Sequence, residues 1–516
     1  MYPLPWRAGV SLRAVKVLIF HGWLLRGTGS NVYNASLARA LARLGHEVHL
    51  VCQDREAPDL AAGTPGTVTI HNPDIGGLLP VYVKDAYAGF EVKTFGELSD
   101  DELDRYIELN ADAVRGLVDS LGGVDAALAN HLIMAPVILG RAGLRYALKV
   151  HGSDLSYTIL PDLDRFGPYA REAVQGAEGI LVGSGHIADR LRQAVDDPGA
   201  NEKVRLGPPG VDVELFRPMP PERRTEQVGE LAGRLREIGA KGSDGDPKAP
   251  TSWDRDPRKA AEALEWYADG TGPRVIFVGK LIVSKGVDLL LAAWPLVHRG
   301  HPEARLLIVG FGAGEPALRA IVDGFERGDL DPLRELAERG RGLEGADDAR
   351  LPILTAFLDR LPGGYGDAAR AAAESIRFAG RLEHEEVAVP VAGSDALVFP
   401  STFPEAFGMV AAEAAAAGVL PVSAAHSGAL EVSAALAEAL PAAAQGLISF
   451  DVDDRSVEAI ADRIDAWLTL GDEDRQATRE ALRATVERLW SWEGVARGVL
   501  AASAGDLEEL PRPMTD

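Results

Sequence analysis

The chain has 516 residues, of which 46% are hydrophobic and 25% are charged, so its composition is that of a globular protein and excludes a fibrous or largely disordered chain. Its 77 acidic residues outnumber its 53 basic residues and give a formal net charge of −24. This charge argues against broad nucleic-acid binding, which needs an extended cationic surface, but it is compatible with a local cationic pocket. At roughly 150 residues per domain, the length indicates about three domains, or two large domains with insertions, and we favour two.

The cysteine content and the first apolar segment predict a cytoplasmic protein. Cys52 is the one cysteine of the sequence, so the chain cannot form an internal disulfide, as expected in a reducing compartment. The first apolar segment, residues 15–20, is much shorter than the ~20 residues that a membrane-spanning helix needs. No signal-peptide pattern precedes it.

The first fifty residues are basic, although the chain as a whole is acidic, and they carry a local charge of +5. Two interpretations are open: a solvated helix face beside a terminus, or a surface that approaches phosphates or a membrane. The second interpretation predicts a weak membrane association through this region. The charged residues concerned are Arg7, Arg13, Lys16, Arg26, Arg39 and Arg43, with Glu47 as the acidic one.

The pattern from residue 15 onward predicts alternating strands and helices. An aliphatic run at residues 15–20 precedes a helix with Ser30 at its N-cap and Gly45 at its C-terminal end, and a second strand follows at residues 47–52. Together these elements form one βαβ unit. We therefore expect a doubly wound α/β domain over residues 1–217. Its further helix and strands are predicted at residues 100–121, 126–129, 146–150 and 179–182.

A second series of strands begins after residue 273 and predicts a second doubly wound domain over residues 273–489. The C-terminal helix at residues 490–516 is expected to pack back on the first domain. Residues 218–272 are interpreted as an insertion or linker and residues 313–375 as a helical insertion, since neither has enough apolar periodicity for a core of its own. The strands of the second domain are predicted at residues 275–278, 305–309, 396–399 and 447–450.

Ligands of open α/β sheets bind at the carboxyl ends of the strands, so the loops there are candidate sites. Residues 404–413 follow a predicted strand and open an alanine-rich helix. The start of a helix is suited to a phosphate, because it presents unpaired N–H groups and the positive end of the helix dipole. The amides concerned belong to Gly408, Met409 and Val410.

Two glutamates bracket this helix start. Glu405 precedes the turn and Glu413 lies one turn inside the helix, so they are suited to accept hydrogen bonds from a sugar on one side of the phosphate and a ribose on the other. Acidic residues in a first helical turn are equally common for capping alone. The pattern by itself therefore leaves both interpretations open.

A second candidate loop spans residues 279–286 and carries Lys280 and Lys285 between a strand and a helix. Two ammonium groups there would neutralise a diphosphate and stabilise it as a leaving group. A loop lysine is usually solvated, but paired lysines after a strand in so acidic a chain favour the functional interpretation.

Several segments carry a resemblance to a known family. They are residues 27–33, 44–48, 151–154, 279–286, 378–382, 404–413 and 427–432. They resemble the retaining group-1 glycosyltransferases, a large nucleotide-sugar family that is glycosyltransferase family 4-like. Its GT-B fold places two Rossmann-like domains across a cleft. The resemblance covers about residues 15–504 except the two insertions, and Ala429 stands where the family often has glycine.

The resemblance implies a donor site. Lys280 and Lys285 would hold the donor diphosphate, although the family more often has arginine at the first of these positions. Glu413 would bind the ribose hydroxyls, and Glu405 would bind the transferred sugar. The other implied donor contacts are made by Gly29 where the backbone approaches the ligand, by Arg381 and Leu382 beside the nucleobase, and by Phe407, Gly408, Met409 and Val410 at the helix start.

The resemblance also implies catalytic roles for Lys280, Lys285, Glu405 and His151, with His151 beside the reacting carbon. The acceptor hydroxyl is expected in the first domain, where polar side chains follow predicted strands. The histidines among them are equally well explained as loop residues with a backbone partner. The candidate acceptor residues are His21, Asn31, Asn130 and His131.

The implied reaction is front-side substitution with retention at the anomeric carbon, in which the leaving phosphate helps to deprotonate the acceptor hydroxyl. No enzyme nucleophile, cofactor or metal is then required, because the lysines and the helix dipole stabilise the departing diphosphate. Asp451 and Asp453 form a D-x-D tripeptide, but its place between a strand and a helix is typical of capping, so we expect no metal site there.

The expected partners are two small molecules, a nucleotide sugar and a hydroxyl acceptor, and no nucleic acid. A UDP-sugar is favoured over GDP-mannose as the donor. Three alternatives remain open: an epimerase with the GT-B fold, a phosphorylase with the same fold, and a non-catalytic protein that binds sugar nucleotides. The joint presence of Lys280, Lys285, Glu405 and Glu413 argues against the last one.

Overall fold

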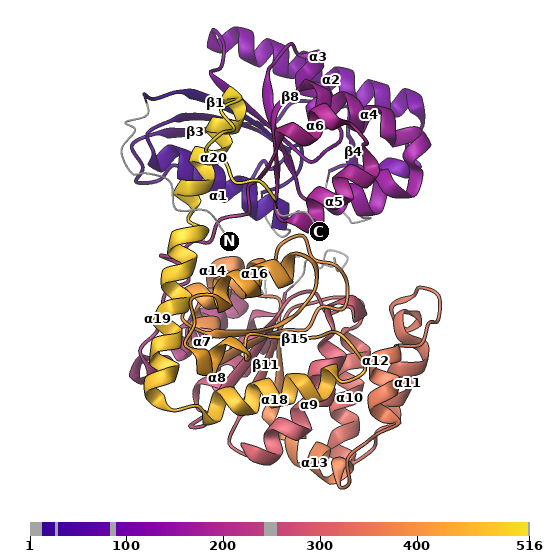
Figure 1. Cartoon of the computed structure of the whole chain (residues 1–516), viewed down its shortest axis with the longest axis vertical. Helices are drawn as coiled ribbons and strands as arrows, with labels where there is room; N and C mark the ends of the chain where they lie inside the picture. Colours follow the sequence, from indigo (N-terminus) through magenta and orange to yellow (C-terminus); the bar gives the residue numbers. More distant parts are fainter. Residues whose placement is uncertain (1–12, 26–28, 83–88, 242–254, 514–516) are drawn as a thin grey trace. The chain divides into compact units, whose positions relative to one another are not determined.

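A computed structural model describes residues 13–25, 29–82, 89–241 and 255–513 (Figure 1). The chain divides into two compact units: unit 1 takes the residues up to 210 and from 489 onward, and unit 2 takes residues 211–488. The sequence predicts these boundaries at 217/218 and 489/490. In the described part of the chain, no helix combines the length and the apolar character that crossing a bilayer requires.

Some predicted features fall outside the described residues. Arg7 and Arg26 of the basic region lie there, and so do Gly27 and Thr28 of the glycine-rich segment.

In the described part of unit 1, seven parallel strands form a sheet in the order β3-β2-β1-β6-β7-β8-β9. The central strands are buried on both faces, which explains their continuous aliphatic sequences. The chain order reverses between β1 and β6, so the doubly wound arrangement predicted for this half is confirmed. The strands are β1 (Lys16–Phe20), β2 (Glu47–Val51), β3 (Thr67–His71), β6 (Ala126–Asn130), β7 (Tyr146–Val150), β8 (Ala177–Val182) and β9 (Val204–Leu206).

Helices cover this sheet, and one of them comes from the C-terminus. α20 contacts α1 and strands β6, β7 and β8, and its Val499 and Ala502 share a core with Leu37 and Leu41 of α1. The predicted return of the C-terminal helix to the first domain is therefore confirmed. The helices of unit 1 are α1 (Gly29–Arg43), α2 (Asp100–Leu121), α3 (Ala135–Arg141), α4 (Leu163–Gly176), α5 (Gly185–Ala194), α6 (Pro198–Lys203) and α20 (Trp492–Ala504).

Unit 1 also holds a two-stranded parallel ribbon of β4 (Leu78–Val81) and β5 (Glu91–Thr94), which the sequence pattern does not predict.

In unit 2, the described residues form a sheet of six parallel strands in the order β12-β11-β10-β13-β14-β15. Its chain order reverses between β10 and β13, so the second predicted doubly wound domain is confirmed as well. The strands are β10 (Arg274–Val278), β11 (Arg305–Val309), β12 (Ile376–Gly380), β13 (Ala396–Phe399), β14 (Leu420–Ala424) and β15 (Ser449–Phe450). The helices between and after them are α9 (Val287–Gly300), α14 (His384–Ala392), α15 (Met409–Ala416), α16 (Ser427–Ala437), α17 (Ala442–Gln445), α18 (Ser456–Thr469) and α19 (Asp472–Leu489).

The segment predicted as an insertion or linker, residues 218–272, belongs to unit 2. It forms α7 (Arg224–Lys241) and α8 (Pro257–Ala268), which pack on each other, and α8 also contacts β12. Ala260, Leu264 and Tyr267 are buried along one face of α8. The apolar periodicity of the sequence underestimates how well this segment packs, because alanines supply much of its apolar face.

The second segment, residues 313–375, is helical as predicted. It contains α10 (Glu315–Arg327), α11 (Asp331–Arg339), α12 (Pro352–Leu358) and α13 (Tyr365–Ala372). α10, α12 and α13 contact α9, and Tyr365 donates a hydrogen bond to the Ala292 carbonyl of that helix at 2.7 Å. This segment is therefore an integral part of unit 2.

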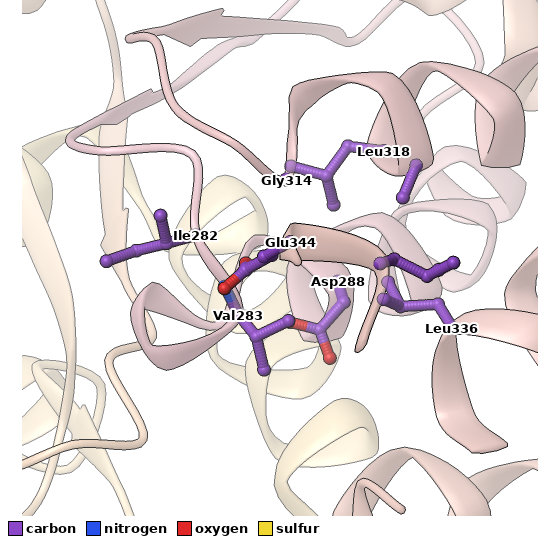
Figure 2. A pocket seen from close by; sticks show the side chains of 9 residues that line it. Ile282, Val283, Asp288, Gly314, Leu318, Leu336 and Glu344 are labelled. Carbon is purple, nitrogen blue, oxygen red and sulfur yellow. The ribbon is translucent and has the colours of Figure 1, made fainter. Parts of the chain in front are cut away.

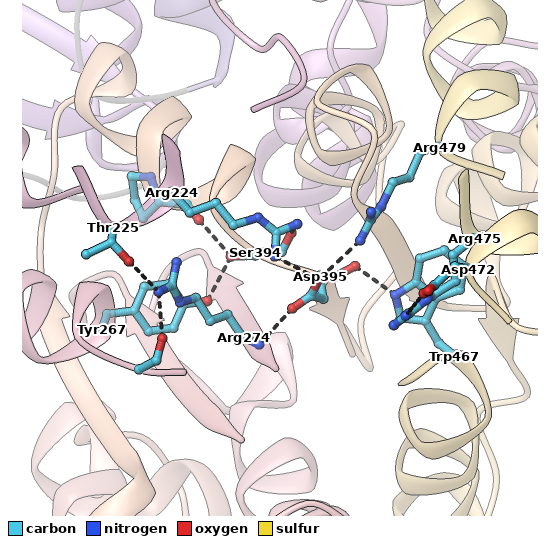
Figure 3. Close-up of polar contacts among 12 residues, drawn as sticks. Arg224, Thr225, Tyr267, Arg274, Ser394, Asp395, Trp467, Asp472, Arg475 and Arg479 are labelled. Atoms are coloured by element: carbon cyan, nitrogen blue, oxygen red, sulfur yellow. Dashed lines mark hydrogen bonds and ion pairs between the residues drawn. The ribbon is translucent and has the colours of Figure 1, made fainter. Parts of the chain in front are cut away.

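Asp395, at the amino end of β13, joins several elements of unit 2 (Figure 3). Its Oδ1 accepts hydrogen bonds from Arg224 of α7 at 2.9 Å and from Arg479 of α19 at 3.1 Å. Its Oδ2 accepts the backbone N–H of Arg274 at 3.0 Å, and its carbonyl accepts the indole N–H of Trp467 at 2.9 Å. Asp395 is buried; its carboxylate ties α7 and α19 to the two central strands, and its backbone carbonyl adds α18.

Candidate functional site

Three histidines follow three neighbouring strands at the carboxyl edge of the unit 1 sheet. His21 follows β1, His131 follows β6 and His151 follows β7. Because parallel strands end at the same edge, the rings come together: the ring centroids of His131 and His151 are 4.7 Å apart. Trp23 contacts His21 and His131 edge-on, with centroid distances of 5.5 and 5.2 Å. The predicted acceptor histidines and His151 thus form one cluster.

The hydrogen bonds of His21 define its protonation. Its Nε2 lies 2.9 Å from Asn31 Oδ1 and 2.9 Å from the Leu24 carbonyl, while its Nδ1 lies 3.0 Å from Asn34 Nδ2. Nε2 therefore donates and Nδ1 accepts, which requires a neutral ring. Burial and the nearby His131 lower the pKa of His21 to about 4, against the opposing effect of Asn31 and Leu24. This ring is neutral at physiological pH.

His151 is neutral for a similar reason. Asn130 donates from Nδ2 to the Phe20 carbonyl at 3.3 Å, so its Oδ1 faces the His151 Nε2 at 3.1 Å and accepts from it. Burial, followed by the nearby His131, Lys149 and His21, holds the pKa of His151 well below its ordinary value. The Nδ1 of this ring is then left with a lone pair that is able to accept a hydrogen bond.

Buried polar atoms without a partner border the same cluster. His131 Nδ1 lies 3.9 Å from Asp154 Oδ1, and within the described residues neither atom has a hydrogen-bond partner. The other oxygen of Asp154 accepts the Leu132 N–H, which ties the loop after β7 to the loop after β6. The Tyr33 hydroxyl is also buried without a described partner, and the Tyr33 ring contacts His151 with centroids 5.0 Å apart. Such atoms are suited to the hydroxyl groups of a bound molecule.

Lys149 lies two residues before His151 on β7 and is buried. Its Nζ donates to the Gly207 carbonyl at 2.6 Å and lies 5.4 Å from the centroid of the Tyr33 ring. Burial lowers the pKa of Lys149 to about 7. Lys149 therefore supports the position of Tyr33 beside His151.

In unit 2, Lys285 and Glu405 form an ion pair, with 2.5 Å between Nζ and Oε1. Lys285 ends the short helical turn Val283–Lys285 before α9, and Glu405 lies in the loop between β13 and α15. The Glu405 N–H donates to Ser427 Oγ at 2.8 Å, and the Glu405 carbonyl accepts the Gly428 N–H at 3.0 Å. The loops after β10, β13 and β14 thus meet at Glu405.

Gly286 allows the loop after β10 to approach the end of β13. Its φ is +66°, and a Cβ at this position would lie 2.0 Å from the Pro400 carbonyl oxygen. A side chain is therefore excluded both by the left-handed backbone and by the contact. The glycine fixes the distance between the Lys285 turn and the Glu405 loop.

Glu413, on α15, is buried and pairs with His384 at the start of α14. His384 Nε2 lies 2.8 Å from Glu413 Oε1. Burial opposes protonation of His384, but the charge and hydrogen bond of Glu413, with smaller contributions from Asp212 and Glu385, raise its pKa above the ordinary value. No motif or spacing in the sequence marks His384 as a residue of the site.

The remaining predicted donor residues of unit 2 also lie at the carboxyl edge of this sheet. Arg381 and Leu382 directly follow β12, and Arg381 Nη2 lies 3.0 and 3.1 Å from the two carboxylate oxygens of Glu383. Phe407 and Gly408 are buried directly before α15. Met409 and Val410 form the first turn of that helix, where backbone amides have no acceptor inside the helix.

Comparison with known proteins identifies the family. The family model described as Glycosyltransferase Family 4 matches residues 27–215, and two models described as Glycosyl transferases group 1 match residues 272–339 and 368–485. The chain belongs to the group-1 glycosyltransferases. The matched residues lie in both units, so the family resemblance seen in the sequence motifs is confirmed.

A curated relative of this group-1 glycosyltransferase is the D-inositol 3-phosphate glycosyltransferase of Segniliparus rotundus, which is 27% identical over 330 residues. The alignment takes in 60% of this chain and spans 61% of the relative's length.

Solved structures resemble the whole chain. A glycosyltransferase from Rickettsia africae is matched with a TM-score of 0.57 at 15% identity, over 96% of this chain and all of the other (100%). Anabaena HepE in complex with UDP and glucose is matched with a TM-score of 0.54 at 15% identity, over 94% of this chain and 98% of the other. At such low identity these matches establish the fold, which is the predicted GT-B fold.

Within each unit of this group-1 glycosyltransferase, most of the predicted residues lie at one edge of the sheet, whereas Lys280 and Gly29 are exposed. Lys280 is exposed, and within the described ranges no hydrogen bond or ion pair of its ammonium group is found, so of the two lysines it is Lys285 that contacts Glu405. Gly29 is exposed as the first residue of α1.

Sequence reasoning missed several residues of the site. Asn34 lies one turn after Asn31 on α1, and that spacing is a signal that was available. Asp154 closes the segment 151–154 that carries the family resemblance, although no role was assigned to it. Lys149 lies on the same face of β7 as residue 151, but a lone lysine in an aliphatic run gives no functional signal.

No metal site is found in the part of the chain that the structure describes: no three His, Cys, Asp or Glu side chains there are arranged to hold an ion. In the D-x-D tripeptide, Asp453 Oδ1 accepts the Arg455 N–H at 2.8 Å just before α18. Arg455 is itself the N-cap of α18, and that helix has no side-chain capping hydrogen bond, so Asp453 stabilises the turn before the helix and not the helix start as predicted.

Proposed function

We propose that this protein transfers a sugar from a nucleotide-diphosphate sugar, with UDP-sugars favoured, to a hydroxyl group of an acceptor, with retention at the anomeric carbon. The observation that carries the proposal is the 2.5 Å contact between Lys285 and Glu405, four residues before α15. A lysine, a carboxylate and free helix amides at one strand edge complement a diphosphate and sugar hydroxyls. Unit 2 is proposed to bind the donor and unit 1 the acceptor.

The donor diphosphate is assigned to Lys285, Lys280 and the first amides of α15. A bound diphosphate would replace Glu405 as the partner of Lys285 and leave Glu405 to accept hydroxyl groups of the transferred sugar. Glu413 is assigned to the ribose hydroxyls. As the C–O bond to the diphosphate breaks, the electron pair moves to the phosphate oxygen, where the lysines and the helix dipole stabilise the charge.

The acceptor hydroxyl is proposed to attack from the side on which the diphosphate leaves. Its oxygen forms the new bond to the anomeric carbon, and its proton passes to the leaving phosphate oxygen. This route uses no enzyme nucleophile, and a covalent route would need two carboxylates at the same carbon. The proposed route also uses no metal, so turnover is expected to persist in EDTA.

In the proposed function, unit 1 supplies neutral polar groups to the acceptor side of the site. His21 and His151 are uncharged because burial lowers their pKa values, to about 4 for His21. His151 Nδ1, whose lone pair is able to accept a hydrogen bond, and the buried Tyr33 hydroxyl and His131 Nδ1 are suited to hydroxyl groups. We assign His151 to the reacting sugar, and His21, Asn31, Asn130 and His131 to the acceptor side of the site.

Two of the compared proteins support this choice of substrates. The HepE structure contains UDP and glucose, and the Segniliparus rotundus relative is a D-inositol 3-phosphate glycosyltransferase. They are consistent with a nucleotide-sugar donor and a hydroxyl-bearing acceptor for this chain.

The test is a donor screen without acceptor, in which UDP-, GDP- and ADP-sugars are compared by thermal shift and by slow hydrolysis. We expect a UDP-sugar to raise the unfolding temperature, since a ligand at 100 times its Kd adds about 2.7 kcal/mol of stability. NMR of the released sugar then reports the anomeric configuration. The absence of both signals for every nucleotide sugar would overturn the proposal. Isomerisation of the donor sugar would instead indicate an epimerase, and sugar-nucleotide binding with no turnover a binding protein.

A further inference from the structure

A glutamate of the helical insertion reaches the turn that carries Lys285. Glu344 lies in the short helix Gly340–Glu344 after α11, and its Oε1 accepts the Val283 N–H at 2.5 Å. Figure 2 shows Glu344 directly beside Val283 and Ile282. The Glu344 side chain is only 8% exposed, so this hydrogen bond is shielded from water.

The turn is held on two sides. The carbonyl of Ser284 accepts the Thr402 N–H at 2.9 Å and the Ser401 hydroxyl at 3.1 Å, both from the loop after β13. On the other side, Glu344 binds the N–H of Val283. Two consecutive residues directly before Lys285 are thus fixed, one by the loop that leads to Glu405 and one by the insertion.

The surroundings of Glu344 fix its position. It lines a small, mostly apolar cavity with Asp288, Leu318 and Leu336, which come from α9, α10 and α11 (Figure 2). A Cβ on Gly314 would lie 3.0 Å from Glu344 Oε1 and 2.9 Å from the Leu281 carbonyl oxygen, so the glycine leaves the space that the carboxylate occupies.

The charges around Glu344 favour the bond to the backbone. Its Oε2 lies 3.8 Å from Arg341 Nε, but this arginine is 67% exposed and the pair is long. Burial raises the pKa of the neighbouring Asp288 to about 7, which limits repulsion between the two carboxyl groups at neutral pH. A carboxylate that accepts a backbone N–H in such a setting makes a charge-assisted hydrogen bond.

We propose that Glu344 is a positioning residue for the donor site: it holds the Val283–Lys285 turn so that Lys285 stays aligned with the donor diphosphate. The insertion at residues 313–375 is then part of the donor site. This inference rests on the proposed function, in which Lys285 binds that diphosphate.

The test compares variants that remove either side of the bond. Glu344→Leu removes the acceptor, and Glu344→Gln keeps a neutral acceptor of the same size. Val283→Pro removes the donor at the first position of a helical turn, where proline is tolerated. Glu338→Leu is the matched control, since Glu338 lies in the same insertion and pairs with Arg350 at the surface.

Three experiments are carried out on each variant below its unfolding temperature: hydrogen–deuterium exchange of the peptide that contains the turn, a titration that gives the Kd for UDP, and kinetics that give KM and kcat with a UDP-sugar. For Glu344→Leu and Val283→Pro we expect faster exchange and an approximately tenfold weaker Kd and higher KM. Glu344→Gln is expected to stay within about threefold of the native protein, and Glu338→Leu to match it. The double variant should lose little more than either single variant, because both remove the same interaction.

The outcomes separate this inference from the proposed function. If the native protein binds no nucleotide diphosphate, the proposed function fails and this inference with it. If the native protein binds UDP but Glu344→Leu and Val283→Pro bind it equally well, the inference alone is overturned. Full additivity in the double variant would also overturn it. If Glu344→Leu does not fold, Val283→Pro decides the question by the same criteria.

Discussion

His384 Nε2 lies 2.8 Å from Glu413 Oε1, so the buried carboxylate that we assign to the donor ribose already has an ionisable partner. His384 is the first residue of α14, which follows β12, and Glu413 lies within α15, which follows β13. Their contact therefore links these two helices. This pair makes the stability of unit 2 depend on pH in a defined direction.

The pKa of His384 is raised in the folded protein, because the partner Glu413 outweighs the opposing effect of burial. The stability that the pair contributes is therefore fully present below the unfolded histidine pKa, about 6.5, and is lost as the pH rises through the higher folded value. We expect His384→Gln to lower the free energy of unfolding by up to ~1 kcal/mol at pH 5.5 and by less at pH 8.5. Urea unfolding of both proteins at the two pH values measures this. A difference that grows with pH would contradict the assignment.

Lys285 should be required for turnover. Lys285→Ala removes the cation that pairs with Glu405 and, in the proposed function, the charge that stabilises the leaving diphosphate. We expect kcat/KM with the preferred nucleotide sugar to fall by roughly 10²-fold to 10³-fold, as for other groups that stabilise developing charge. Lys259→Ala is the control, since Lys259 forms an exposed pair on α8. Equal activities of the two variants would refute the assignment of Lys285.

Gly286 should tolerate no side chain. In Gly286→Ala, the Cβ would lie 2.0 Å from the Pro400 carbonyl oxygen, and the φ of +66° adds strain. We expect a loss of about 1–3 kcal/mol in the free energy of unfolding together with weaker UDP binding, because the Lys285 turn must shift. Gly366→Ala is the contrasting variant: nothing lies within 4 Å of its Cβ on α13, so it should be neutral or stabilising. Denaturant unfolding and calorimetric titration report the two effects.

We expect the loss of Asp395 to lower the free energy of unfolding more than the loss of any other polar side chain of unit 2. Asp395→Ala leaves Arg224 and Arg479 without their buried carboxylate and frees the Arg274 N–H. We expect destabilisation of about 3–5 kcal/mol, the range for breaking a buried charge pair from one side. The exposed Asp472 pairs with Arg475 four positions before Arg479, and Asp472→Ala should cost less than about 0.5 kcal/mol. Similar losses for the two variants would show that the network in Figure 3 is not a stabilising centre.

Much of the fold follows from local pattern. The aliphatic runs that become β1, β7, β10 and β13 are continuous because these strands are buried on both faces, and such runs are recognisable without a structure. The meeting of His21, His131 and His151 follows from the same rule, since parallel strands deliver their next residues to one edge. The packing of α8 could not be predicted in this way, because the apolar face of an alanine-rich helix stands out only weakly from the rest of the sequence.

The partners of the site residues could not be predicted in the same way. Glu344 meets Val283 across 61 positions of sequence, and His384 meets Glu413 across 29. Neither pair has a spacing that a helix or a strand would impose. Contacts of this kind depend on how whole helices pack, and a single sequence carries no record of that packing.

The most direct test of the account is the affinity of UDP for the native protein and for Glu413→Ala, measured by calorimetric titration beside the surface control Lys259→Ala. The account predicts that the native protein and the control bind UDP alike and that Glu413→Ala binds it at least about tenfold more weakly, a loss of about 1.4 kcal/mol. Equal binding by all three proteins would contradict the placement of the donor at the carboxyl edge of the unit 2 sheet.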